Sequence, residues 1–184
     1  MDEGNQVIVC NKDDILLTKK KGTNCFSLQF IVKNPNIVLK NLIKPTIYDL
    51  IYELNKDVVE RIERSDMAMD SNCFDVLFVF KRFGSELGIA QKYMFLKTTR
   101  ETDEKQIRLL SKSVPYSNPV TNCETAICDY ANLIVNIVSD NEVNINYEFN
   151  MKLEEDLPKY MENIAGLLMK KIFNRLKIFI ENIS

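Results

Sequence analysis

The chain has no histidine, no tryptophan, and only five glycines and five prolines among its 184 residues. Without histidine, the Ser-His-Asp and Cys-His nucleophilic devices, histidine metal sites and the usual general base are all excluded. The glycines form neither G-x-G-x-x-G nor G-x-x-x-x-G-K, so a glycine-rich phosphate loop is absent as well. No pair of acidic residues sits in an apolar setting suited to proton transfer. We therefore expect a protein that is not an enzyme and that holds no cofactor or metal.

The cysteine content, the net charge and the lack of long apolar runs limit the compartments and partners that we expect. The five cysteines form no CxxC pair, and their odd number favours free thiols in a reducing compartment over a disulfide framework or a zinc site. The net charge of −2 provides no basic field for nucleic acid. No apolar run approaches the roughly 20 residues that cross a bilayer, and Met1-Asp2-Glu3 is no signal peptide. We expect a soluble, cytoplasmic protein with one domain over residues 1–184, because 46% apolar content allows a sizeable core.

The C-terminal stretch carries the clearest pattern. Apolar and polar residues alternate over 143–151, which predicts a strand with one buried face. The acids and the proline of 154–158 predict the start of a helix, which continues to about Asn182 past one tolerated glycine, Gly166. Its apolar stripe is wider than a single two-sided contact requires, so we infer that a sheet wraps around this helix. The expected wet side of the helix carries Lys159, Lys170, Lys171, Asn174, Arg175 and Lys177.

Most of the remaining chain has the pattern of short strands. Consecutive strands with short turns pair antiparallel, and a strongly twisted sheet of this size curls so that the long helix can fill its concave side. The predicted fold class is therefore α+β, a curved antiparallel sheet wrapped around a long C-terminal helix, which is the helix-grip arrangement. Strands are expected over 6–11, 14–18, 26–33, 73–82, 93–99, 106–114 and 125–138, one or two short helices between 36 and 54, and either helix or strand over 57–64.

Four segments of the chain together resemble a known family. They are Tyr93-Met94-Phe95-Leu96-Lys97, the strand end at 109–114 with the proline-bearing turn after it, the helix entry at 154–160, and Pro45-Thr46-Ile47-Tyr48-Asp49. The family is the START domains, the steroidogenic acute regulatory protein-related lipid-transfer domains, in which tryptophan usually holds the position of Tyr48. The similarity runs from about residue 14 to the C-terminus. It implies a helix-grip fold that holds one lipid between the sheet and the terminal helix and carries it between membranes.

Strand parity adds candidate residues to this implied lipid site. Tyr93, Phe95 and Lys97 share one face of their expected strand, and we assign that face to the interior. The alternating strand at 143–151 and the first turns of the terminal helix supply the rest, and methionine there suits a flexible ligand. The candidate lipid-binding residues are Lys97, Tyr93, Phe95, Ile145, Tyr147, Phe149, Met161, Ile164, Ala165, Leu168 and Ile172.

Lys97 and the loop at 84–90 each have two interpretations. The family often places a buried cation near Lys97, which implies a contact with a lipid headgroup; otherwise Lys97 extends into solvent or pairs with a structural acid. Residues 84–90 correspond to the family's flap over the cavity mouth, and Leu87 and Ile89 lie there between glycines. These two residues either contact the membrane during exchange or pack onto the helix.

Three functions remain in competition. The leading hypothesis is a noncatalytic carrier or sensor that binds one lipid, a phospholipid, sterol or related molecule, and contacts a membrane surface transiently. The second is an interaction module whose cavity is filled by large side chains, with protein partners that the sequence does not indicate. The third is a cyclase- or hydrolase-type enzyme, as in other helix-grip proteins. Cavity volume separates the first two, because a carrier needs a pocket that can take a lipid and a module has a packed interior.

Overall fold

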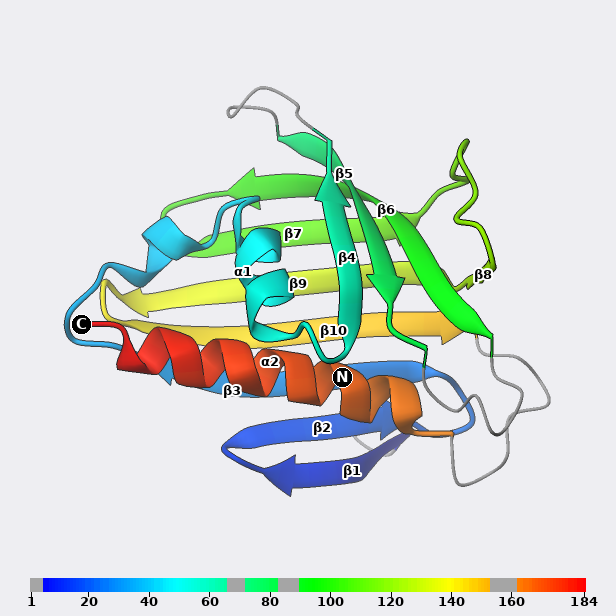
Figure 1. Ribbon diagram of the computed structural model, residues 1–184. Helices are drawn as coiled ribbons and strands as arrows, with labels where there is room; N and C mark the ends of the chain where they lie inside the picture. The colour runs from blue at the N-terminus through cyan, green and yellow to red at the C-terminus, as the bar shows by residue number, and fades with distance from the viewer. Residues whose placement is uncertain (1–4, 66–71, 83–89, 153–161) are drawn as a thin grey trace.

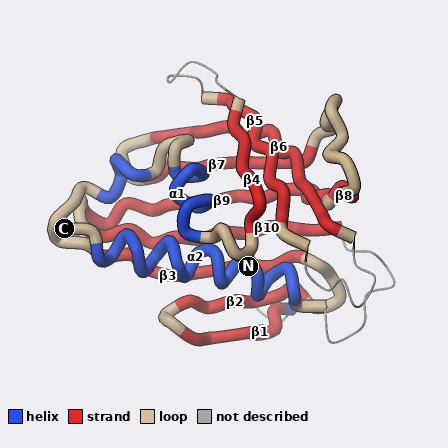
Figure 2. Tube along the Cα trace, viewed as in Figure 1, coloured by secondary structure: helices blue, strands red, loops and turns tan. Residues whose placement is uncertain are grey.

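The computed structural model describes residues 5–65, 72–82, 90–152 and 162–184, which form one large sheet with two α-helices on one of its faces (Figures 1 and 2). The strands are β1 (Gln6–Lys12), β2 (Ile15–Lys20), β3 (Cys25–Lys33), β4 (Val59–Arg64), β5 (Cys73–Phe80), β6 (Gln91–Thr102), β7 (Gln106–Ser113), β8 (Cys123–Thr125), β9 (Ile127–Ser139) and β10 (Glu142–Lys152). The helices are the 3-10 helix η2 (Leu39–Leu42), α1 (Ile47–Leu54) and α2 (Ile164–Asn182).

The sheet runs in the order β1-β2-β3-β10-β9-β7-β6-β5-β4, and every neighbouring pair along it is antiparallel. The short strand β8 pairs in parallel with β6 outside this path. The expected fold class, a curved antiparallel sheet around a long C-terminal helix, is confirmed. Residues 57–64, which fitted either helix or strand, contribute β4, and the helix start expected at 154–158 lies outside the described residues.

The core lies between the sheet and the two helices. Alternate residues of β3 point inward, and the Phe26 ring stacks on Phe149 of β10 with 5.4 Å between ring centroids. Phe30, further along β3, packs against Phe173 of α2 at 5.8 Å. Aromatic side chains bury large apolar areas, so the first contact stabilises the pairing of β3 with β10 and the second holds α2 against the sheet. No helix among the described residues is long and apolar enough to cross a membrane.

Two lysines of α2 lie differently from the expectation of a wet side. Lys170 and Lys177 are only 7% and 8% exposed. Their aliphatic stems are covered, while the ammonium groups reach Asp13 in the β1–β2 turn and Glu181 on the same helix, each at 2.7 Å. Long cationic side chains often lie along apolar surface in this way, so a lysine in the sequence pattern does not by itself mark a solvent face.

The start of α2 approaches the sheet closely, because Gly166 has no side chain. A β-carbon at this position would lie 2.5 Å from Cδ1 of Phe26, and the Phe26 ring is fully buried against Phe149. The ring therefore cannot swing away into solvent to make room. Gly166 is more than the tolerated helical glycine that its pattern suggests, because its lack of a β-carbon sets the distance between α2 and β3.

The end of α2 is capped by a side chain from the sheet. Asn34, directly after β3, is fully buried, and its Nδ2 donates to the carbonyl oxygens of Ile180 at 2.7 Å and Ile183 at 2.8 Å. Its Oδ1 accepts from the amide of Asn36 at 2.8 Å, and its backbone N–H and C=O both bond to Asn141 in the β9–β10 turn. The last carbonyls of a helix lack partners within the helix, and here one buried amide supplies them.

Replacing Gly166 with alanine should lower the free energy of unfolding by about 1–3 kcal/mol through overpacking. In an ordinary helix the same change would raise it by about 1 kcal/mol. Urea titration of the wild type and the variant measures the difference, and Phe26→Leu in the Gly166→Ala background should recover part of the loss. An alanine variant as stable as the wild type would mean that α2 does not press on Phe26.

Asn34→Asp should lower the free energy of unfolding by about 2 kcal/mol or more at neutral pH, because a carboxylate cannot donate to the two helix carbonyls. Asn36→Asp is the matched control, since Asn36 is exposed and its side chain should be replaceable within about 0.5 kcal/mol. Equal losses in the two variants, measured by chemical denaturation, would contradict the capping role of Asn34.

Candidate functional site

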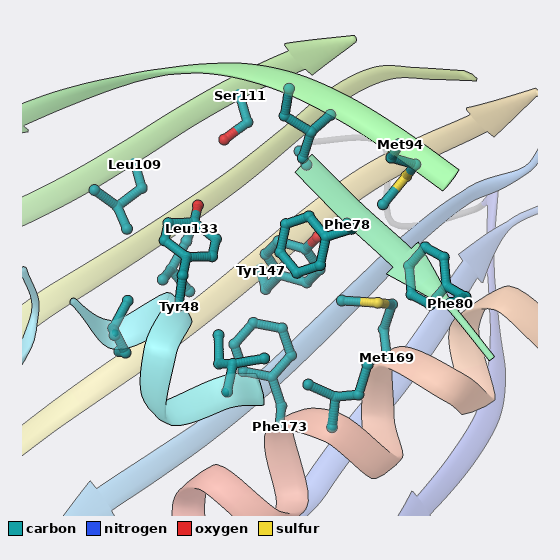
Figure 3. Close-up of a pocket in the computed structure, with 15 residues that line it drawn as sticks. Tyr48, Phe78, Phe80, Met94, Leu109, Ser111, Leu133, Tyr147, Met169 and Phe173 are labelled. Carbon is teal, nitrogen blue, oxygen red and sulfur yellow. The ribbon is translucent and has the colours of Figure 1, made fainter. Parts of the chain in front are cut away.

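A hollow lies between the inner face of the sheet, α1 and the middle of α2 (Figure 3). Its volume is about 50 Å³. Ligand sites for small molecules usually occupy roughly 300–1,000 Å³, so the interior of this structure is too closely packed to hold a lipid without rearrangement. The side chains that line the hollow are Ile47, Tyr48, Ile51, Phe78, Phe80, Met94, Leu96, Leu109, Ser111, Ala131, Leu133, Tyr147, Met169, Ile172 and Phe173.

Aromatic rings and two methionines form the walls of the hollow. Tyr147 lies between Phe149 and Phe173, with ring centroids 5.2 Å and 4.7 Å away. Met94 of β6 and Met169 of α2 line the same space (Figure 3). Methionine has flexible, unbranched side-chain bonds and adapts to irregular shapes, so these two walls can change shape at small cost.

One group of hydroxyls within the grip is satisfied internally. The Thr98 and Ser111 hydroxyls bond to each other at 2.9 Å, and Figure 3 shows Tyr48 extending from α1 with its hydroxyl towards Ser111. Burial raises the pKa of Tyr48, and hydrogen bonding from Ser111 and Thr98 partly offsets that rise. These three side chains tie α1 to β6 and β7, and they stay uncharged at any physiological pH.

The Tyr147 hydroxyl differs from these three in its hydrogen bonding. Burial raises the pKa of Tyr147 well above the ordinary value for tyrosine, and no hydrogen bond offsets the rise. Within the part of the chain that the structure describes, this hydroxyl has no hydrogen-bond partner. The side chain is half-buried and lines the hollow. The arrangement offers one uncommitted hydroxyl in a chamber whose other polar groups, those of Tyr48 and Ser111, are engaged in hydrogen bonding at the α1 side.

The expected residues of β10 and α2 fall on the inner side of the sheet, although few of them border the hollow. Tyr147 and Ile172 line it. Ile145 and Phe149 are buried in the surrounding core, which Ala165 and Leu168 cover as partly buried residues. Ile164 is partly buried at the start of α2, and Met161, Leu87 and Ile89 lie outside the described residues.

The side chains of β6 that point to the interior are not the ones that the sequence analysis assigned there. Met94, Leu96 and Thr98 point into the grip, whereas Tyr93 and Phe95 pack on the outer face of the sheet. The assignment of Tyr93, Phe95 and Lys97 to the interior is therefore wrong. Lys97 is exposed, and its cross-strand neighbours are Asp75 and Lys112.

The physical reason is a second small core on that outer face. Leu77, Val79 and Tyr93 are buried there beneath the segment that leads from β7 to β8, and the ring of Tyr116 lies 4.4 Å from that of Phe95. Both faces of β6 are consequently apolar. When a strand is buried on both sides, alternation of polarity no longer tells which face is the inner one.

The sequence analysis identified none of the lining residues of α1, β5, β6, β7 and β9, and it missed Met169 and Phe173 of α2. A signal existed for two of these residues, because Phe78 and Phe80 belong to the uninterrupted apolar run of β5 and a strand buried on both faces has such a run. Tyr48 was noted only for its position in the START-like motif. No three acidic or cysteine side chains converge to hold a metal in the described ranges of the chain.

Comparison with known proteins gives matches in structure alone. No protein-family profile matches the chain, and no curated protein matches it by sequence. The lipid transfer and protein localization domain of human StarD13 (DLC2) superposes with a TM-score of 0.74 at 14% identity, covering 97% of this chain and 90% of that one. Human STARD10 gives 0.76 at 10% identity, covering 97% and 74%.

A bacterial protein gives a similar result. The STAR-related lipid transfer protein of Xanthomonas axonopodis superposes with a TM-score of 0.68 at 11% identity, covering 96% of this chain and 98% of that one. At identities this low the likeness concerns the fold, which these structures share over nearly the full length of the chain. The chain therefore has the START-like helix-grip fold.

Proposed function

We propose that the protein binds one lipid molecule in the hollow between the sheet and α2, and that the hollow enlarges as the lipid enters. The observation that carries this proposal is an apolar chamber, lined from five strands and both α-helices, that retains an unpartnered tyrosine hydroxyl. The names of the neighbours with this fold, which include lipid transfer proteins, give independent support.

Enlargement is needed, because a chamber of about 50 Å³ is much smaller than a lipid. The methionines at 94 and 169 can change rotamer without breaking a hydrogen bond. Each Å² of ligand surface removed from water contributes roughly 25 cal/mol, so an acyl or ring system can offset the cost of moving these side chains. In this proposal a cytoplasmic protein contacts membranes only transiently, to transfer the lipid or to sense it.

A second candidate is a noncatalytic interaction module, and the small volume of the hollow favours it. In that case the aromatic side chains fill the space that a lipid would occupy, and the domain binds a protein partner through its surface. The two candidates differ in one measurable property, which is whether the purified protein carries a lipid.

Native mass spectrometry after incubation with phosphatidylcholine vesicles that contain sterol and diacylglycerol tests the proposal. The wild type should show a one-to-one complex with a lipid. Ala131→Leu should reduce the bound fraction about tenfold or more, because the added carbons occupy the hollow that Ala131 lines. Ala126→Leu is the control, since Ala126 is buried outside the lining. A wild type without bound lipid, in a protein that is folded by circular dichroism, would favour the module.

Lys97→Ala should leave both the amount and the headgroup class of extracted lipid unchanged within about twofold, because Lys97 is exposed on the outer face. Lys112→Ala provides the matched control, since Lys112 is an exposed lysine directly across the strand pair. Loss of phospholipid binding in the Lys97 variant alone would contradict the position of the site inside the grip.

A further inference from the structure

The chemistry of the hollow indicates which class of lipid it can hold. None of the described side chains that line it carries a charge. A phosphate or ammonium headgroup brought into this chamber would lose its hydration and gain no ion pair, which is strongly unfavourable. The polar end of a ligand in this chamber must therefore be uncharged.

The polar groups of the chamber narrow the class further. Thr98 and Ser111 bond to each other, and Tyr48 faces them from α1. Tyr147 alone among the described hydroxyls of the chamber is without a hydrogen-bond partner. Its ring is held in place by stacking on Phe149 and by a tilted contact with the ring of Phe173. The hydroxyl thus has a set direction and is free to donate.

We propose that the Tyr147 hydroxyl donates a hydrogen bond to the oxygen of an uncharged lipid, such as a long-chain alcohol, a sterol or an acylglycerol, and so selects neutral lipids over charged ones. This inference rests on the proposed function, because it assigns the ligand of the same hollow. Once a lipid fills the chamber and excludes water, the ligand oxygen satisfies a donor that would otherwise be left unpaired, and such pairing discriminates more sharply than apolar contact does.

Three probes with one chain length isolate the polar end of the ligand. 1-Hexadecanol, hexadecane and hexadecyl phosphate are each supplied in phosphatidylcholine vesicles, and the protein-bound amount is measured by mass spectrometry after separation from the vesicles. The wild type should bind hexadecanol about fivefold more tightly than hexadecane, the difference expected for one hydrogen bond, and should take up little hexadecyl phosphate.

Tyr147→Phe should bring the hexadecanol-to-hexadecane ratio close to one and leave hexadecane binding unchanged. The control is Tyr116→Phe, since Tyr116 lies on the outer face of the sheet, and it should keep the wild-type ratio. The stability of the ligand-free variant to urea is measured as well. Since the Tyr147 side chain is half-buried and its hydroxyl forms no hydrogen bond with another described residue, the phenylalanine variant should unfold at the same urea concentration as the wild type or a higher one.

The outcomes separate the two proposals. If hexadecanol and hexadecane bind but Tyr147→Phe keeps the ratio of the wild type, the assignment of Tyr147 is overturned and lipid binding stands. If hexadecyl phosphate binds best, selection of neutral lipids is overturned. If no probe binds, both proposals fall. A lower urea midpoint for Tyr147→Phe would show that the hydroxyl already has a partner, and this also overturns the assignment.

Discussion

The terminal helix α2 is held against the sheet at both of its ends. Near its start, the missing side chain of Gly166 lets the helix rest on the buried ring of Phe26. At its end, the buried amide of Asn34 takes up the last carbonyls and also bonds to the β9–β10 turn. The two points are about 21 Å apart along the helix axis. The first contact depends on the absence of a side chain at Gly166, and the second depends on the side chain of Asn34. The distance between helix and sheet is therefore set by one residue at each end.

The hollow lies between these two points, where the middle turns of α2 face the sheet. Met169 and Phe173 come from those turns, and Tyr147 comes from the strand beneath them. Because the ends of the helix are fixed, we infer that the space grows by movement of side chains in the middle, with α1 on the opposite wall. Arg175 of α2 donates to Asn55 and Asp57 just after α1, which holds the two helices together behind the hollow.

The sequence predicted the architecture well and the lining of the site poorly, for a physical reason. In β10 polar and apolar residues alternate, and Tyr147 was assigned to the correct side. In β6 both faces are buried, one by the interior core and one by the residues around Tyr116. The order of polar and apolar residues therefore did not show which side chains point inward, and Lys97 was assigned to the wrong side. The roles of Gly166 and Asn34 depend on contacts between distant segments, which no local pattern contains. The volume of the hollow depends on the fit of fifteen side chains from seven elements, and that is a property of packing alone.

Carbon-13 methyl NMR of the methionines reports directly whether a lipid enters the hollow. Met94 and Met169 line it, whereas Met151 packs against the core outside the lining and serves as an internal reference. When 1-hexadecanol is added in phosphatidylcholine vesicles, the Met94 and Met169 methyl resonances should shift together and saturate at one equivalent, while that of Met151 stays in place. Unchanged Met94 and Met169 resonances, in a protein that remains folded, would show that no lipid enters the hollow.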